Sequence, residues 1–273
     1  MLTRTSPSVR RASSQASCAD QAVAELHAGL VHEDVALAVF FASPEYDTEE
    51  LAAALRSRFE GIPLIGCTTA GEIGPGGYLQ GSLSGFSLSS TDFLVEGRLI
   101  SGLKALEIDE GKAVSEQLLG ALGERGCSPT RSNSFGFLLV DGLSVCEEVL
   151  VSSLHKPLGD IQLFGGSAGD GLKFEQTLVW HEGAFHSDAA VLTLIQTELP
   201  FRVFRTQHFV DTPSKMVVTE ADPLSRIVTE INGETAAREY AQQVGLSLDE
   251  LTPRVFSAHP VVVRVGGEMF VRS

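Results

Sequence analysis

A strand–helix–strand–strand pattern occurs twice in this chain of 273 residues, and it constrains the fold more than any other feature. The two occurrences span residues 35–90 and 134–195. Gly66 of the first corresponds to Gly165 of the second, at an offset of 99 residues. A shared order of elements with a common offset is typical of a duplicated unit. The sequence therefore predicts two similar units that pack together.

Apolar and amphipathic segments alternate along both units. The run VALAVFFAS (35–43) is apolar on both faces, as strands of covered sheets are, and residues 18–30 and 43–59 have helical periodicity. The expected fold class is α/β, with two repeated strand–helix–strand–strand units forming a mixed-sheet domain over residues 18–221. The pattern changes near the ING turn, so a second α/β domain is expected over residues 222–273. It ends in a strand and is expected to be truncated.

Composition limits the classes of partner. Residues 1–17 are Ser-rich and basic and lack the apolar segment of a secretory signal, so we expect a disordered tail. The formal charge is −15, which opposes binding to nucleic acid and to anionic membranes. No run approaches the roughly 20 apolar residues that span a bilayer. The four cysteines have no CxxC spacing, so reduced thiols in the cytoplasm are expected.

Two similar loops follow corresponding strands, with AGE at 70–72 and AGD at 168–170. Their glycines are expected to permit sharp turns at strand ends, and their acids to cap backbone amides. One interpretation is a tight corner that serves the fold. The other is a ligand pocket, because ligands of open α/β sheets bind at the carboxyl ends of strands. The candidate pocket residues are Gly66, Cys67, Glu72, Gly165, Gly166 and Asp170.

Catalytic and nucleotide-binding motifs are weak. Neither loop matches GxxxxGK[ST] or GxGxxG, and GxSxG is absent. Cys67 follows a strand, where catalytic thiols occur, but a thiol nucleophile needs a base within hydrogen-bond reach. The corresponding residue of the second unit is Gly166. An enzyme that uses Cys67 is the least favoured alternative.

Histidines are the remaining candidates for chemistry. His181 and His186 flank a turn in VWHEGAFHSDAA, and His208 lies between aromatic residues. His181 and His186 could form a metal pair, but two ligands fall short of the usual three or four for zinc. The His208 imidazole can be a core residue or an axial ligand in an apolar pocket. Haem needs an axial imidazole, apolar walls and cations for its propionates. The fifteen phenylalanines, with Arg202 and Arg205, are compatible with haem without specifying it.

Several motifs resemble one known family. IGCTTAGEI, FGGSAGD and HSDAAV resemble the FIST N-terminal sensory domain. EINGETAAREYAQQVG, followed by HPVVVRVGGEMFVRS, resembles the start of the FIST C-terminal domain. The resemblance covers about residues 20–273. TQHF, VVTEADP and TEINGETAA are similar to the NosP-type, nitric-oxide-sensing branch.

The resemblance implies an intracellular bacterial signal-transduction sensor rather than an enzyme. It implies haem b, nitric oxide as the signal, and a partner histidine kinase or cyclic-di-GMP enzyme (a diguanylate cyclase or phosphodiesterase). His208 is the expected haem-iron ligand, with His186 and His181 as reserves and Arg205 and Arg202 near the propionates. The alternative is a FIST sensor of a small metabolite, such as an amino acid, that uses the paired loops and no haem.

Overall fold

The structure is a computed structural model that describes residues 7–171, 173–206, 209–223 and 226–272. The chain forms two compact units, one up to Phe204 and one from Arg205. Each is a mixture of helices and strands, as the sequence predicts, and each is described by itself below.

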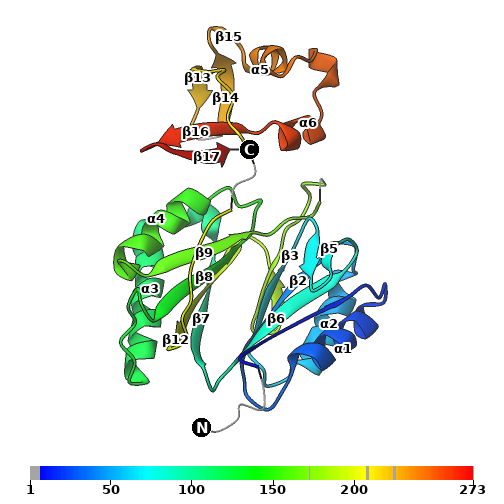
Figure 1. The fold of residues 1–273 in the computed structure, drawn as a ribbon, viewed down its shortest axis with the longest axis vertical. Helices are drawn as coiled ribbons and strands as arrows, with labels where there is room; N and C mark the ends of the chain where they lie inside the picture. The colour runs from blue at the N-terminus through cyan, green and yellow to red at the C-terminus, as the bar shows by residue number, and fades with distance from the viewer. Residues whose placement is uncertain (1–6, 172, 207–208, 224–225, 273) are drawn as a thin grey trace. The chain divides into compact units, whose positions relative to one another are not determined.

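The larger unit contains two repeats of the same order of elements (Figure 1). The first repeat consists of β1 (Val9–Ser14), α1 (Ala19–Leu30), β2 (Val35–Ala42), α2 (Thr48–Arg58), β3 (Leu64–Thr68), the hairpin β4–β5 (Glu72–Gly74 and Gly77–Leu79) and β6 (Leu83–Ser89). The second consists of β7 (Phe93–Ser101), the short 3-10 helix η1 (Leu103–Ala105), α3 (Ile108–Glu124), β8 (Ser134–Val140), α4 (Glu147–Leu158), β9 (Gln162–Ser167), the hairpin β10–β11 (Val179–His181 and Ala184–His186) and β12 (Ala189–Thr197).

Strand pairing confirms the predicted duplication. In the first repeat β2 is parallel to β3 and antiparallel to β6, and in the second β8 is parallel to β9 and antiparallel to β12. The registers also correspond, since Phe40 pairs with Gly66 where Leu138 pairs with Gly165. Each repeat begins one strand and one helix earlier than the sequence predicted. β1 pairs with β6, as β7 pairs with β12.

One strand breaks the symmetry of the two sheets. β10 belongs to the second repeat but pairs with β3 of the first, antiparallel, with Trp180 opposite Gly66. The first sheet therefore has six strands in the order β1-β6-β2-β3-β10-β11, whereas the second has four in the order β7-β12-β8-β9. Strands of covered sheets are apolar on both faces, which explains runs such as VALAVFFA in β2.

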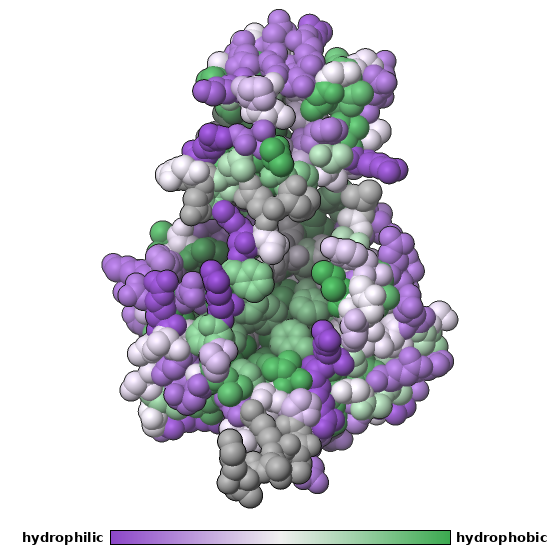
Figure 2. Space-filling model, in the orientation of Figure 1, coloured by the Kyte–Doolittle hydropathy of each residue, from purple (hydrophilic) through white to green (hydrophobic). Residues whose placement is uncertain are grey.

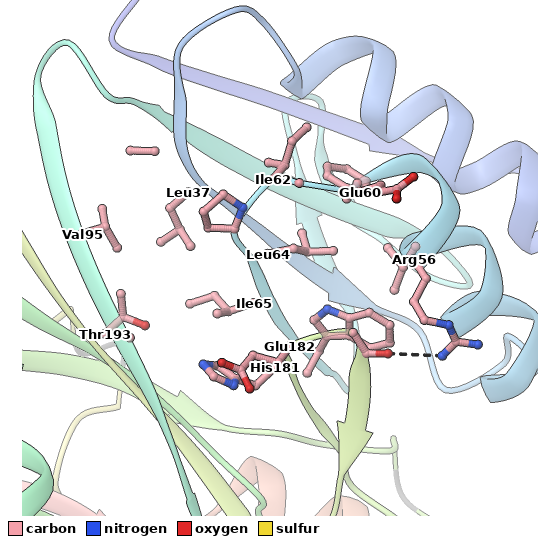
Figure 3. Close-up of a pocket in the computed structure, with 18 of the residues that line it drawn as sticks. Leu37, Arg56, Glu60, Ile62, Leu64, Ile65, Val95, His181, Glu182 and Thr193 are labelled. Carbon is pink, nitrogen blue, oxygen red and sulfur yellow. Dashed lines mark hydrogen bonds between the residues drawn. The ribbon is translucent and has the colours of Figure 1, made fainter.

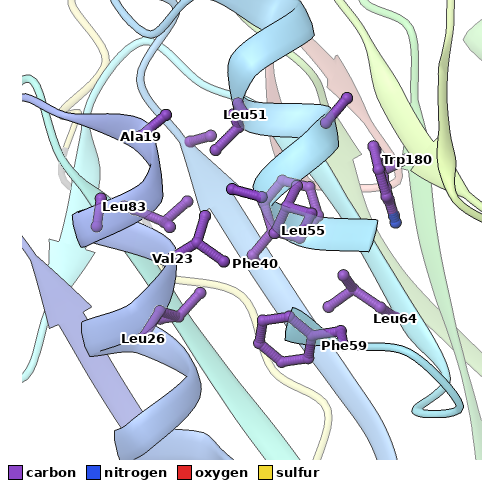
Figure 4. Close-up of a cluster of buried hydrophobic side chains, with 14 of the residues drawn as sticks. Ala19, Val23, Leu26, Phe40, Leu51, Leu55, Phe59, Leu64, Leu83 and Trp180 are labelled. Carbon is purple, nitrogen blue, oxygen red and sulfur yellow. The ribbon is translucent and has the colours of Figure 1, made fainter. Parts of the chain in front are cut away.

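The larger unit has four layers, with one pair of helices outside each sheet (Figure 1). One core lies between α1, α2 and the six-stranded sheet, where Phe40, Leu55 and Trp180 are buried (Figure 4). A second core fills the space between the two sheets, and a third lies under α3 and α4. Burial of these apolar side chains is the main stabilising contribution.

Local sequence signals mark both ends of α2. Asp47 precedes α2, and its carboxylate accepts hydrogen bonds from the amides of Glu49 and Glu50 at 3.0 and 2.9 Å. Such a side chain satisfies amides that have no partner within the helix. Arg56 and Arg58 occupy the last turn, where cations are favoured by the helix dipole.

The prediction of a disordered tail over residues 1–17 is wrong for β1, which pairs with β6 along its whole length. Its sequence, VRRASS, has no apolar alternation because the strand is held by backbone pairing and by contact with α1 rather than by large buried side chains. Ala12 lies against Gly29 of α1, where a Cβ atom would be 2.5 Å from the Ala12 Cβ. A period-2 pattern therefore could not reveal this strand.

The smaller unit contains a three-stranded sheet, two α-helices and a hairpin. Its elements are β13 (Val218–Asp222), β14 (Ile227–Ile231), β15 (Glu234–Thr235), α5 (Ala236–Val244), the 3-10 helix η2 (Leu248–Glu250), α6 (Pro253–Ala258), β16 (Val261–Val265) and β17 (Glu268–Arg272). The predicted end of α5 at Gly245 is confirmed, with φ of 75°. The predicted turn between β16 and β17 is also confirmed, since Val265 pairs with Glu268 across Gly266 and Gly267.

The boundary between the units differs from the predicted boundary at residue 222. The smaller unit begins at Arg205. β13 ends at Asp222 and pairs with β14, so a boundary there would divide an antiparallel hairpin. The change of sequence pattern at ING marks the turn that enters α5 rather than a boundary between domains.

The two corresponding glycines lie inside strands, not at the sharp turns that the sequence predicted. A Cβ atom at Gly66 would lie 2.5 Å from the Phe40 ring and 2.6 Å from the Phe40 carbonyl oxygen. A Cβ atom at Gly165 would overlap the carbonyl oxygen of Leu138. Both glycines therefore permit close approach of the adjacent strand.

We expect Gly66→Ala to lower the free energy of unfolding by about 2 kcal/mol, because overpacking a rigid site forces backbone and ring to move. Gly166→Ala is the matched control, since nothing lies within 4 Å of a Cβ atom there. Urea denaturation of the two variants measures the difference. Equal losses of stability in both variants would contradict this account of Gly66.

Candidate functional site

The AGE and AGD loops meet at the carboxyl ends of β3 and β9. The amide of Gly169 donates to the carbonyl oxygen of Thr68 at 3.0 Å, and a Cβ atom at Gly169 would lie 3.1 Å from the amide nitrogen of Ala70. Thr68 also exchanges two hydrogen bonds with Leu178, both of 3.0 Å. The loops thus lie side by side, as expected of paired repeats.

Both loop acids are buried and hydrogen-bonded. Glu72 accepts hydrogen bonds from the hydroxyls of Thr69 and Ser82, each at 2.6 Å, and from the Ser82 amide at 3.2 Å. Asp170 accepts from the amides of residues 174, 175 and 176 at 3.0, 2.7 and 2.9 Å. These contacts support the interpretation of tight corners with capping acids, because the carboxylates are already occupied.

The other predicted loop residues serve different purposes. Cys67 lies in the core between the sheets, and burial raises the pKa of its thiol to about 12. A thiol of this kind is not a nucleophile at neutral pH. Gly165 and Gly166 lie on the exposed edge of β9. The loops do not line the cavity described next.

A cavity of about 520 Å³ lies between the two sheets, at the start of β3 (Figure 3). We call it the β3–β7 cavity. It is bounded by the end of α2 and the residues that follow, by β7 and by the turn of the β10–β11 hairpin. Its apolar wall includes Leu37, Leu64, Ile65 and Val95, and its polar lining consists of Arg56, Glu60, Glu96, Arg98, His181, Glu182 and Thr193.

His181 contributes its imidazole to the lining of the cavity. The side chain is half-buried, and burial lowers its pKa below the ordinary value. His186 and Arg98 lower the pKa further, whereas Glu182 acts in the opposite direction. The imidazole is therefore neutral at pH 7, the form in which a ring nitrogen can bind a metal or accept a hydrogen bond.

Thr193 is fully buried on β12, and among the described residues its hydroxyl has no hydrogen-bond partner. It pairs with Gly97 of β7. A Cβ atom at Gly97 would lie 3.3 Å from the Thr193 hydroxyl oxygen and 4.0 Å from His181 Nε2. The glycine thus leaves open a space that both polar atoms border. A buried hydroxyl without a hydrogen-bond partner lowers the stability of the fold, so its presence is consistent with a group that hydrogen-bonds to a ligand.

Arginines and glutamates lie around the same cavity. Arg56 donates to the carbonyl oxygen of Gly183 at 3.2 Å and so fixes the hairpin turn against α2 (Figure 3). Arg98 Nη1 lies 4.0 Å from Glu96 Oε2. The other carboxylate oxygen, Glu96 Oε1, forms an ion pair of 2.8 Å with Arg125 Nη1. The lining therefore presents both signs of charge to a ligand.

The predicted haem residues that the structure describes are divided between the two units. His181 alone of them lines the β3–β7 cavity, and His186 Nε2 lies 3.3 Å from the carbonyl oxygen of His181. Arg202 is an exposed residue of the larger unit. Arg205 belongs to the smaller unit, where it lies 4.9 Å from the ring centre of Phe270. His208 lies outside the described residues.

Sequence reasoning missed Arg56, Gly97, Arg98 and Thr193 as cavity residues. They come from helix and strand interiors, where no spacing rule marks a ligand. It also missed Asp141, a buried carboxylate at the end of β8 that accepts hydrogen bonds from Thr177, Asp188 and, at 3.0 Å, Leu143. Asp141 ties β8 to two loops of the same repeat.

Asp170 should make the fold sensitive to acid. Burial alone would raise the pKa of Asp170, but the three amide donors outweigh it and hold the pKa below its ordinary value. The stabilisation is therefore complete above the unfolded pKa of about 3.9 and is lost as the pH falls through the folded pKa.

We expect Asp170→Asn to lower the melting temperature at pH 7, with the gap to wild type narrowing towards pH 3. Thermal unfolding at a series of pH values measures it, with the exposed Asp160→Asn as control. A gap that is constant with pH would contradict the capping role.

In the described part of the chain, no group of three or more histidine, cysteine, aspartate or glutamate side chains is arranged to hold a metal ion. Among the helices described, none combines the length and apolarity of a membrane span.

Comparison with known proteins identifies the family. No curated protein matches the chain. The family model of the FIST N domain matches residues 36–234, which is well over half of the chain and includes both repeats from β2 onward. The chain belongs to the FIST N domain family of sensory domains in signal-transduction proteins.

Proposed function

We propose that this FIST protein is a haem-based sensor of nitric oxide, and that His181 in the β3–β7 cavity is the axial ligand among the described residues. The observation that carries the proposal is the half-buried imidazole, whose pKa is lowered by burial, in a cavity between the two sheets. A neutral imidazole is the state that ligates haem iron. His208 remains the other predicted ligand.

The residues that line the cavity fit haem in two respects. The wall formed by Leu37, Ile65 and Val95 is apolar. Arg56 and Arg98 supply two cations for propionates. When bound, haem would supply an iron that can take up a diatomic gas.

The protein would hold the ligand and transmit its binding to a partner. The cavity has walls from both sheets, so a ligand there contacts β3 and β10 on one side and β7 and β12 on the other. A ligand that binds one spacing of the sheets more tightly shifts the population towards it. The output would pass to a protein partner, for which we propose a histidine kinase or a cyclic-di-GMP enzyme.

A second candidate is a haem-free sensor of a small zwitterionic metabolite such as an amino acid. Two observations favour it. The lining carries Glu60, Glu96 and Glu182 beside the two arginines, which suits a ligand with both an ammonium and a carboxylate group. The unpartnered hydroxyl of Thr193 offers a hydrogen bond that a polar ligand can complete.

Haemin titration of the purified full chain tests the first candidate. We expect a sharp Soret band that shifts when the reduced protein meets nitric oxide, and we expect His181→Ala to abolish it because the axial nitrogen is lost. His155→Ala, at an exposed position on α4, is the matched control, and His208→Ala is measured in parallel. Circular dichroism confirms that each variant is folded.

The outcomes separate the candidates. Loss of the Soret band in His181→Ala alone would support the β3–β7 cavity as the haem site. Loss of the band in His208→Ala alone would assign the iron ligand to His208 and would mean that the cavity does not bind haem. A wild-type spectrum equal to that of free haemin would rule out the haem sensor. A melting-temperature rise with one amino acid of a panel would then support the second candidate.

Thr193→Val should separate stability from binding. Valine removes a buried hydroxyl that has no partner, so we expect the free energy of unfolding to rise by about 1 kcal/mol. Binding of a polar ligand in the cavity should weaken, because the hydroxyl is no longer available to it. Urea denaturation and ligand titration measure the two effects.

Thr177→Val is the matched control, because the Thr177 hydroxyl donates to Asp141 and its removal should destabilise the fold. A Thr193→Val variant that binds a polar metabolite as tightly as wild type would exclude the cavity as that metabolite's site.

A further inference from the structure

The two repeats differ in how the outer edges of β3 and β9 are covered. β10 pairs with the outer edge of β3, placing Val179 opposite Cys67 and Trp180 opposite Gly66. β9 occupies the corresponding place in the second sheet. Among the strands described, β9 pairs only with β8 and ends the sheet. A free strand edge presents unpaired amide and carbonyl groups to any strand that fits.

Side chains at corresponding positions of the two repeats differ in exposure. Ala52 of α2 is 8 % exposed, whereas its counterpart Val151 of α4 is 42 % exposed. Ile65 of β3 is 4 % exposed, whereas its counterpart Phe164 of β9 is 41 % exposed. In the view of Figure 2, apolar side chains gather in a hollow of the larger unit. The β9 edge thus leaves apolar surface that the β3 edge buries.

The hairpins that follow the two loops also correspond. In β10–β11, Trp180 pairs with Phe185, and their rings, 4.8 Å apart, pack on the helix side of the first sheet (Figure 4 labels Trp180). In β4–β5, the corresponding pair is Ile73 and Tyr78. These two side chains are 71 % and 91 % exposed, whereas Trp180 is 1 % exposed. The first repeat thus carries an apolar hairpin without a sheet edge to cover.

Chain length explains why the hairpin does not cover β9 of its own chain. β10 begins nine residues after Asp170, which lets it cross to the other repeat, whereas Glu72 is itself the first residue of β4. β4 is held near β1, where a Cβ atom at Gly74 would lie 2.8 Å from the hydroxyl oxygen of Ser13. A second chain is free of this restriction.

Charge also matches between the hairpin and the edge. Residues 73–91, around the hairpin, contain no charged side chain, and neither do residues 161–169, around β9, in a chain with a formal charge of −15. Natural edge strands are usually protected by charged residues or proline. An unprotected edge and an uncharged hairpin can meet without the repulsion that two acidic surfaces would otherwise impose.

We propose that the β9 edge is a self-association site, and that it takes the β4–β5 hairpin of a second copy of this chain as an added strand. β5 would pair with β9 as β10 pairs with β3. Ile73 and Tyr78 would cover Leu163 and Val151 on the helix side of the sheet, just as Trp180 shares one buried cluster with Leu64 and Ala52 in the first repeat. The pairing depends on neither haem nor any other ligand.

Sedimentation velocity of the full chain over a range of concentrations tests the proposal. Wild type should pass from a 29.1 kDa monomer to a dimer as its concentration rises. Gly166 corresponds to Cys67, which lies opposite Val179 on the covered edge of β3. Gly166→Lys therefore places a charge at the proposed contact, where nothing lies within 4 Å of a Cβ atom. Gly166→Lys and Tyr78→Ser should each raise the dimer dissociation constant by about tenfold or more.

Gly120→Lys is the matched control, because Gly120 lies on α3 with nothing within 4 Å of a Cβ atom, and it should dimerise as wild type does. A mixture of the Gly166→Lys and Tyr78→Ser chains should form mixed dimers, since one chain retains its hairpin and the other its edge. Circular dichroism confirms that the variants are folded.

A wild-type chain that stays monomeric at every concentration would overturn the proposal. A dimer that neither substitution weakens would do the same. Weakening by Gly166→Lys alone would assign the edge to a different strand and overturn the assignment of the hairpin.

Discussion

The pairing of β10 with β3 is the interaction on which the larger unit depends. Through it a strand of the second repeat completes the sheet of the first, and Trp180 enters the core under α1 and α2. Thr68 adds hydrogen bonds to Leu178 and Gly169 at the same junction. Because each repeat leaves one sheet face apolar, neither can bury its surface alone, and the crossing strand fixes how the two faces meet.

Much of the fold could be predicted because it repeats. The offset between Gly66 and Gly165 predicted the paired strands, and the apolar run of β2 predicted a covered sheet. β1 could not be predicted, because VRRASS is held by backbone hydrogen bonds that leave no apolar period. The purpose of Gly66 was also misjudged, since a glycine that admits a neighbouring strand looks in sequence like one that permits a turn.

The candidate site was less predictable than the fold, for a physical reason. Conspicuous loop residues such as Glu72 and Asp170 use their carboxylates on amides and hydroxyls of their own loops. The β3–β7 cavity instead comes from residues such as Gly97 and Thr193, which are ordinary strand residues until the sheets stack. His181 was noticed because it flanks the turn in VWHEGAFHSDAA, but its partners in the cavity depend on tertiary packing alone.

The cavity has a wall from each half of the duplication. α2 and β3 contribute Arg56 and Ile65, whereas β7 and β12 contribute Arg98 and Thr193. A half-length ancestor would have possessed only one wall, so it could have enclosed a ligand only where two separate polypeptides met. Fusion of the genes for those halves would have turned a concentration-dependent pocket into a permanent one. It would also have freed the two halves to diverge, and the second repeat now supplies both His181 and Thr193 to the lining.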